Sequence, residues 1–298
     1  MRILRLAVLL FLCSLIPMSL SAQQSAPATP TSGPQSSQAA SLLQQSVAAM
    51  TGGASVTDVT MVGNVTVTTG ATAAGPTTAE GTITLVTTAA GQSQITSVLP
   101  SGTWVTTENY ATNPRTSTLT GPSGTAQDTA PEDLMGPSPA WFCPALLISV
   151  IAPQTYIASY VGQETHNGSA VQHVSFWPQA SNSPTSSFLT TGQQVLTGPG
   201  PSLPLQIGQE ELFVDSASLL PRELIIRIRG YRSAVNSSDP QNPTIPTLVD
   251  EHVEFSDYRQ AQGRLVPFQI HVSIGPIPLM DIQLSSVNFN TGATIAAN

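Results

Sequence analysis

The sequence predicts an α+β fold, in which one large antiparallel sheet of ten to twelve strands is combined with one or two short helices. From Val56 onward, apolar and polar residues alternate with a period of two, as in VTDVTMVGNVTVTT at residues 56–69. Such alternation is typical of strands with one buried face. Short turns rich in Gly, Pro, Asn and Ser separate these stretches, so the strands should be antiparallel and follow one another in the sheet.

The first 22 residues have the features of a cleavable secretory signal. Two arginines precede an apolar run at residues 6–16, which is too short to cross a bilayer, and small residues follow. We expect cleavage after Ala22 or one residue earlier. Lipidation of Cys13 is not expected, because a modified cysteine follows a small residue and Leu12 is large. The mature chain is therefore expected to be periplasmic or secreted, without stable insertion in a membrane.

A leader and a helix are expected to follow the signal. Residues 23–37 are rich in Pro, Ser and Gln and contain no large apolar residue, which predicts a disordered leader. After it, apolar residues recur at steps of four, four and three, at Ala39, Leu43, Val47 and Met50. The pair Gly52-Gly53 closes this pattern. The spacing predicts a short amphipathic helix that ends at the glycines.

Residues 38–298 are expected to form a single β domain, because no internal repeat and no shift in composition divides them. The strongest turn signal is Asn167-Gly168, between YIASYVGQET and AVQHVSFW, which predicts a two-residue hairpin. Two turn-rich stretches near 178–206 and 233–246 are expected to be surface loop insertions.

The most apolar stretch after the signal is AWFCPALLISVIA at residues 140–152. It is shorter than the roughly 20 residues that a membrane-spanning helix needs. Pro144 fits the first turn of a helix and Pro153 ends it, whereas three β-branched residues leave a strand as the alternative. In either form the element is almost entirely apolar, so it must lie inside the sheet or across its opening.

Charge and composition exclude several classes of function. The chain has 9 basic and 17 acidic residues, a net charge of −8, and loss of the two arginines of the signal makes it about −10. Such a surface repels nucleic acid. Every basic residue is arginine, so neither a Schiff-base lysine nor a P-loop lysine exists. Cys143 is the only cysteine after the signal, so no intramolecular disulfide is expected, and we interpret it as a buried, unreactive thiol.

No common motif of a nucleophile, zinc, dinucleotide or calcium site occurs, so we expect no catalysis, no cofactor and no metal. The best polar constellation is in DEHVEFSDY, where His252, Glu254 and Tyr258 would share one strand face and Glu251 and Asp257 the other. This set could bind a metal or transfer a proton. Alternating apolar residues explain it more simply, as the outer side of a half-buried strand.

Two further polar features have structural interpretations. Arg227 and Arg229 share a strand face, where they could bind an anion, but pairing with acidic residues on a neighbouring strand is favoured. His166 lies beside the predicted hairpin turn and is expected to be solvated. His173 and His271 are expected to be exposed strand residues.

The order of these elements resembles the outer-membrane lipoprotein carrier superfamily. The stretch SLLQQSVAAMTGGASVTDVTMVGNV is similar to the opening helix and first strand, YIASYVGQETHNGSAVQHV to the hairpin, and LFVDSASLLPRELII to a strand, turn, proline and strand unit. VEFSDYRQAQGRLVPFQIHV and MDIQLSSVNFNTG are similar to the last three strands. The resemblance implies a distant member, in which an incomplete β-barrel wraps helices and an apolar cavity. No arginine lies between Arg5 and Arg115, so the early-strand arginine of periplasmic carriers has no counterpart.

On this resemblance, we expect an exported, non-enzymatic binding protein that shields an acyl chain or another apolar ligand in a half-barrel cavity. The element at 140–152 would line or cap the cavity through Trp141, Phe142, Leu146, Leu147, Val150 and Ile151. Two alternatives are an envelope scaffold domain whose own side chains fill the core and, less favoured, a hydrolase that uses the His252 face. Neither nucleic acid nor a cofactor is expected as a partner.

Overall fold

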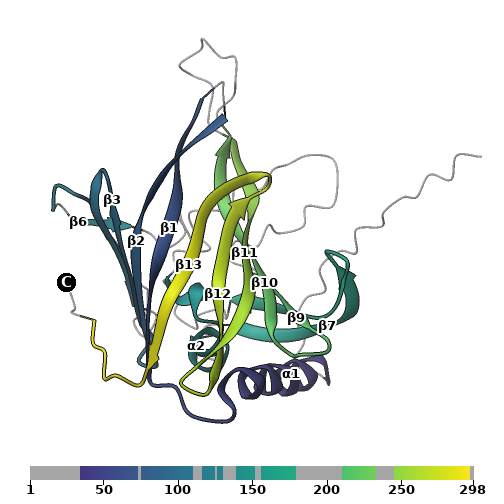
Figure 1. Ribbon diagram of the computed structural model, residues 1–298. Helices are drawn as coiled ribbons and strands as arrows, with labels where there is room; N and C mark the ends of the chain where they lie inside the picture. Colours follow the sequence, from purple (N-terminus) through teal and green to yellow (C-terminus); the bar gives the residue numbers. More distant parts are fainter. Residues whose placement is uncertain are drawn as a thin grey trace, which may run out of the picture.

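The computed structural model describes residues 34–72, 75–109, 116–124, 126–129, 139–151, 156–178, 210–232 and 245–295. Within them, 13 strands form one sheet in the order β6-β5-β4-β3-β2-β1-β13-β12-β11-β10-β9-β8-β7. All neighbouring strands are antiparallel. The sheet curves but keeps β6 and β7 as separate edges (Figure 1). The predicted fold class, an incomplete antiparallel barrel around short helices, is confirmed.

The strands follow the chain in two runs. The first run is β1 (Asp58–Thr72), β2 (Gly75–Thr88), β3 (Gln92–Leu99), β4 (Gly102–Asn109), β5 (Thr116–Thr120) and β6 (Ala126–Thr129). The second run is β7 (Tyr156–His166), β8 (Ser169–Pro178), β9 (Glu210–Asp215), β10 (Pro221–Arg232), β11 (Ile245–Ala261), β12 (Arg264–Ile274) and β13 (Ile277–Phe289). The two runs meet where β1 pairs with β13, and Val65 lies opposite Ile282.

Several predicted segments fall beyond the described residues. The predicted signal, most of the leader and most of the loop insertions near 178–206 and 233–246 lie outside them. Strand β8 ends at Pro178 and β11 begins at Ile245, so each insertion borders a strand.

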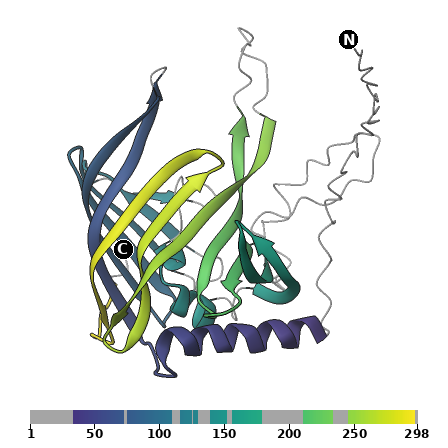
Figure 2. The same ribbon diagram turned by 45° about the vertical axis from the view of Figure 1, so that its right-hand side comes forward.

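Helix α1 (Pro34–Thr51) confirms the predicted amphipathic helix but begins earlier, so residues 34–37 of the predicted leader are helical. Its buried residues keep helical spacing; they are Ala39, Leu42, Leu43, Ser46, Met50 and Thr51. The helix ends at Gly52 and Gly53, whose φ angles are 63° and 81°, a left-handed conformation that glycine adopts at little cost. Helix α1 packs against β7 and β12 at one end of the sheet (Figure 2).

The turn between β7 and β8 is the predicted two-residue hairpin. Asn167 and Gly168 have φ angles of 48° and 75°, and His166 pairs with Ser169 across the turn. Positive φ at both central residues is the type I′ pattern, which matches the twist of paired strands. The turn therefore fixes the register of the edge hairpin.

The two faces of the sheet differ in what covers them. We call the face that packs against α1 and residues 139–151 the concave face, and the opposite face the convex face. Leu224 on β10 and Val253 on β11 are buried on the concave face, within the hydrophobic core. Their sequence neighbours Glu223 and His252 point to the convex face, because successive strand side chains alternate.

Candidate functional site

Residues 139–151, called here the internal segment, form three consecutive helical turns, which confirms a helix rather than a strand. The turns are the 3₁₀ turn η2 (Pro139–Phe142), the α-helical turn α2 (Pro144–Leu146) and the π-helical turn η3 (Leu147–Ile151). Pro144 lies in the first turn of α2, where a missing N–H costs little. The amides of Leu146 and Leu147 donate to the carbonyl oxygen of Cys143, at 3.1 and 2.9 Å. The segment is therefore compact but irregular.

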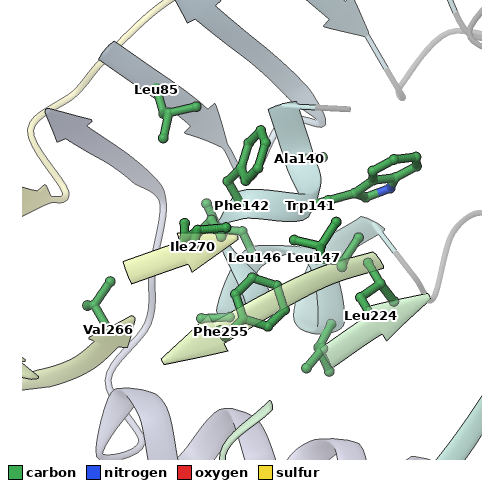
Figure 3. Packing of buried hydrophobic residues seen from close by; sticks show 14 of the residues in the cluster. Leu85, Ala140, Trp141, Phe142, Leu146, Leu147, Leu224, Phe255, Val266 and Ile270 are labelled. Carbon is green, nitrogen blue, oxygen red and sulfur yellow. The ribbon is translucent and has the colours of Figure 1, made fainter. Parts of the chain in front are cut away.

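The internal segment is buried along most of its length. Residues 140–148 are all buried, and the apolar residues among them belong to the same hydrophobic cluster as the concave face. Figure 3 shows Phe142 on the side of Leu85 from β2, and Leu146 beside Ile270 from β12. The segment thus occupies the space that an apolar ligand of this face would need.

Four of the six residues predicted to line or cap a cavity lie in this core. Their exposed fractions are 6% for Trp141, 0% for Phe142, 0% for Leu146 and 3% for Leu147. The side chains of Val150 and Ile151 lie outside the described part of the chain, although their backbone belongs to η3. The structure brings the four described side chains onto one short element, and their contact with a ligand stays a prediction.

The hydrogen bonds of the internal segment to described residues stay within the segment. The Cys143 amide donates to the carbonyl oxygen of Ala140 at 3.4 Å, and the Ser149 hydroxyl donates to that of Ala145 at 2.6 Å. Among the described residues, the contacts between the segment and the sheet are therefore apolar. Apolar contacts are not directional, so no hydrogen bond among the described residues fixes the segment to the sheet.

Cys143 and Tyr258 lie close to each other in the interior. Burial raises the pKa of the Cys143 thiol to about 11, although hydrogen bonds from the backbone of Leu146 and Ala145 lower it. Burial, with a smaller contribution from Cys143, also raises the pKa of Tyr258, whose hydroxyl donates to the carbonyl oxygen of Pro221 at 2.7 Å. The thiol is protonated at neutral pH and is not a nucleophile. The prediction that Cys143 is buried is confirmed.

The polar constellation predicted around His252 is not assembled. Tyr258 packs against the hydrophobic core, whereas Glu254 is exposed. Between them, Asp257 has a φ of 53°, and this left-handed backbone interrupts the alternation that the prediction assumed. The expectation that His252, Glu254 and Tyr258 share one face is therefore wrong, and the hydrolase alternative loses its third side chain.

Two histidines hold one buried carboxylate on the convex side of β10. His166 Nε2 and His252 Nδ1 lie 2.5 and 2.6 Å from the two oxygens of Glu223, whose side chain is 4% exposed. The His166 ring also stacks on Phe213, with centroids 3.8 Å apart. The expectation that His166 is solvated is therefore wrong, because a hydrogen bond to Glu223 and a ring contact hold it against the sheet.

The other polar strand residues are also paired. His173 Nε2 lies 2.8 Å from a carboxylate oxygen of Glu211, and its residue is half-buried rather than exposed. Arg227 binds Asp250 on the neighbouring strand with a contact of 2.9 Å, which confirms the predicted cross-strand pair. The Arg229 side chain is not described. In the described ranges, no group of three or more His, Cys, Asp or Glu residues could hold a metal ion.

Acidic side chains on the concave face are the feature that sequence reasoning missed. Glu251, Glu210 and Glu108 are 1%, 2% and 1% exposed. The Oε1 atom of Glu251 accepts no hydrogen bond from any described residue, and burial raises the pKa of this carboxyl to about 8. The signal was available, because Glu251 interrupts the apolar alternation that continues at Val253 and Phe255.

Two small pockets lie among the described residues. One of about 110 Å³ lies between β1, β12 and β13, beside Asn64, Gln269 and Asp281. The other, of about 10 Å³, lies where Met50 and Cys143 approach β12. A site for a sizeable organic ligand needs about 300 Å³ or more. Neither of these two pockets is large enough for an acyl chain.

No known family model matches the chain, and no curated protein matches it either. Solved structures do. A putative outer membrane lipoprotein-sorting protein domain from Vibrio parahaemolyticus has a TM-score of 0.52 at 12% identity, over 87% of this chain and 95% of that chain. A DUF1329 family protein from Desulfovibrio piger has a TM-score of 0.51 at 8% identity, over the same shares. The chain has the fold of these two structures.

This fold confirms the resemblance predicted from the order of elements in the sequence. A LolA superfamily protein from Nitrosomonas europaea matches 84% of this chain and 92% of its own, at 9% identity and a TM-score of 0.47. In this chain, the internal segment and α1 cover the concave face. None of the described helices is long and apolar enough to span a bilayer.

Proposed function

We propose that the chain is an exported, non-enzymatic binding protein that shields an acyl chain or another apolar ligand on the concave face of its half-barrel. The carrier fold supports this proposal. The observation that carries it is the internal segment itself, in which residues 140–148 are buried against the concave face and make no hydrogen bond to the described strands.

The ligand would enter between the internal segment and the sheet. The segment would move outward, so that Trp141, Phe142, Leu146, Leu147, Val150 and Ile151 become one wall of a cavity and the concave face becomes the other. Each buried methylene contributes roughly 0.8 kcal/mol. A chain of about 12 carbons would therefore supply on the order of 10 kcal/mol before the cost of moving the segment.

The side chains available for catalysis support a role without chemistry. The Cys143 thiol is buried with a raised pKa. His166 and His252 share the carboxylate of Glu223, so each ring already has a partner. Tyr258 packs against the core and does not share the strand face of His252.

One observation favours the second candidate function, an envelope scaffold domain with a filled core. The four described site residues are as deeply buried as the strand residues around them, and protein interiors packed in this way leave few voids. In a binding protein the internal segment would move away from the sheet, whereas in a scaffold it would stay packed against the sheet.

A binding experiment separates them. The purified chain would be titrated with a neutral fluorescent apolar probe and with dodecanol, and native mass spectrometry of protein from the cell envelope would detect a retained lipid. We expect saturable binding, which Phe142→Ala weakens. The control is Phe213→Ala, since Phe213 is 4% exposed and stacks with His166 outside the core cluster. No binding to the wild type at any soluble concentration would favour the scaffold.

A further inference from the structure

We propose that the ligand of the concave face carries an amine or another cationic hydrogen-bond donor beside its apolar chain, and that Glu251 binds this group. The inference rests on the proposed function and names the class of ligand that the same face would take. It is carried by one side chain whose burial the fold does not explain.

Glu251 lies on the concave face in the C-terminal run of strands. On β11 it is opposite Ile226 of β10 and Ile274 of β12. Two residues further along, Val253 points to the same side and is fully buried in the core. The acid is therefore set in an apolar row, where neither cross-strand neighbour has a side-chain hydrogen-bond donor.

The carboxyl group is buried and incompletely bonded. Glu251 is 1% exposed, and its Oε1 atom accepts no hydrogen bond from the residues that the structure describes. Buried polar groups are almost always hydrogen-bonded, because an unpaired one costs stability. An apolar residue of similar size would fill this position without that cost. A donor brought by a ligand would complete the bonding of the acid.

The charges around Glu251 favour a cation over an anion. Ile226 of β10 lies between Glu251 of β11 and Glu210 of β9, and both acids are buried. Strands β9 and β11 are two strand spacings apart, which is about 10 Å. Arg227, next along β10, points to the convex face and binds Asp250. Once ionised, the Glu251 carboxylate attracts an alkylammonium group and repels the carboxylate of a fatty acid.

Binding of a cation would release a proton. Burial raises the pKa of Glu251 to about 8, so the carboxyl is mostly protonated at pH 7. An ammonium group beside it favours the carboxylate, and the carboxyl proton passes to the buffer. Each bound ammonium ion therefore releases up to one proton, while a neutral alcohol releases none.

The test compares three ligands with the same chain and different head groups: dodecylamine, dodecanol and dodecanoate, each below its micelle concentration at pH 7. Affinities come from displacement of the neutral apolar probe, and calorimetry in two buffers of different ionisation enthalpy gives the protons released. We expect dodecylamine to bind at least about tenfold more tightly than dodecanol, since hydrogen bonds to charged groups are the strong ones. Dodecanoate should bind most weakly.

Two variants of the same strand complete the experiment. Glu251→Gln should lose the preference for the amine and the proton release, while it keeps the affinity for dodecanol. Glu254→Gln, whose side chain is exposed, should behave as the wild type. Equal affinities for amine and alcohol in the wild type, or a preference that survives in Glu251→Gln, would overturn the inference and leave the proposed function standing. If the probe and all three ligands fail to bind, the proposed function fails as well.

Discussion

At the scale of single residues, Glu251 should make stability depend on pH. Its pKa of about 8 in the folded state lies above the ordinary value of 4.5, because burial disfavours the charged form. Between these two values the folded state holds a proton that the unfolded state has lost. The stabilising contribution is complete below pH 4.5 and disappears as the pH rises through 8, at up to about 1.4 kcal/mol per unit.

Urea unfolding at pH 5, 6, 7 and 8 measures this dependence. The wild type should lose stability across the series, and Glu251→Gln should show a flatter curve, whereas Glu254→Gln should keep the wild-type slope. Asp58 and Asp215, whose pKa values are lowered, act in the opposite direction but only below about pH 4. Parallel curves for the wild type and Glu251→Gln would contradict the assignment.

Much of the residue-scale error came from assuming an uninterrupted strand. The alternation around His252 placed Glu251 and His252 on opposite faces, as they are. The same alternation placed Tyr258 on the wrong face, because no local sequence pattern predicts that Asp257 has a φ of 53°. The pairing of His166 with Glu223 was also beyond the sequence, since 57 residues separate them and only the sheet brings them together.

At the scale of elements, local signals were sufficient where local chemistry determines the structure. The glycine pair after α1 and the Asn167-Gly168 turn both require positive φ, which is a property of the residues themselves. The apolar pattern between Pro144 and Pro153 predicted a covered helix, and the internal segment is one. Whether its side chains meet the sheet or a ligand depends on the energy of moving it, which no sequence pattern encodes.

Truncation of one leucine tests that energy. Leu146 of the internal segment and Leu224 of β10 are both 0% exposed. Leu224→Ala should cost about 2 to 5 kcal/mol of global stability, as is usual for a buried leucine. Leu146→Ala should cost less. If the internal segment opens locally, the loss of stability cannot exceed the free energy with which the segment packs against the sheet. Equal losses in denaturant unfolding would mean that the segment is an integral part of the core.

At the scale of the whole molecule, the two runs of strands are joined where β1 meets β13, and Asp58 lies at the end of this joint. Its Oδ1 accepts hydrogen bonds from the amide and hydroxyl of Thr291, at 2.9 and 2.8 Å, and its Oδ2 accepts from the amide of Gly292 at 3.1 Å. These bonds attach the segment after β13 to the start of β1. They bring the carboxyl pKa below its ordinary value although burial would raise it.

Loss of this carboxyl should weaken the whole sheet. Asp58→Ala removes a buried acceptor that several donors share, and we expect a loss of about 1 to 3 kcal/mol in the free energy of unfolding. Thermal unfolding followed by circular dichroism checks it. A control is Asp281→Ala, which removes an exposed acid paired with His271 and should change stability by less than about 1 kcal/mol. Similar effects of both variants would show that the joint is not stabilised at Asp58.

The reactivity of Cys143 distinguishes local opening of the internal segment from unfolding of the whole molecule. The thiol is 4% exposed, and burial raises its pKa to about 11, so a thiol reagent should react with it far more slowly than after denaturation. In a Cys13→Ser background, the dependence of the labelling rate on urea gives the free energy of the motion that exposes it. For a binding protein whose segment moves, this free energy should be smaller than that of global unfolding and should depend only weakly on urea, because a local opening exposes little surface. In a scaffold, Cys143 would become exposed only when the entire sheet unfolds, and the two free energies and their urea dependences would coincide.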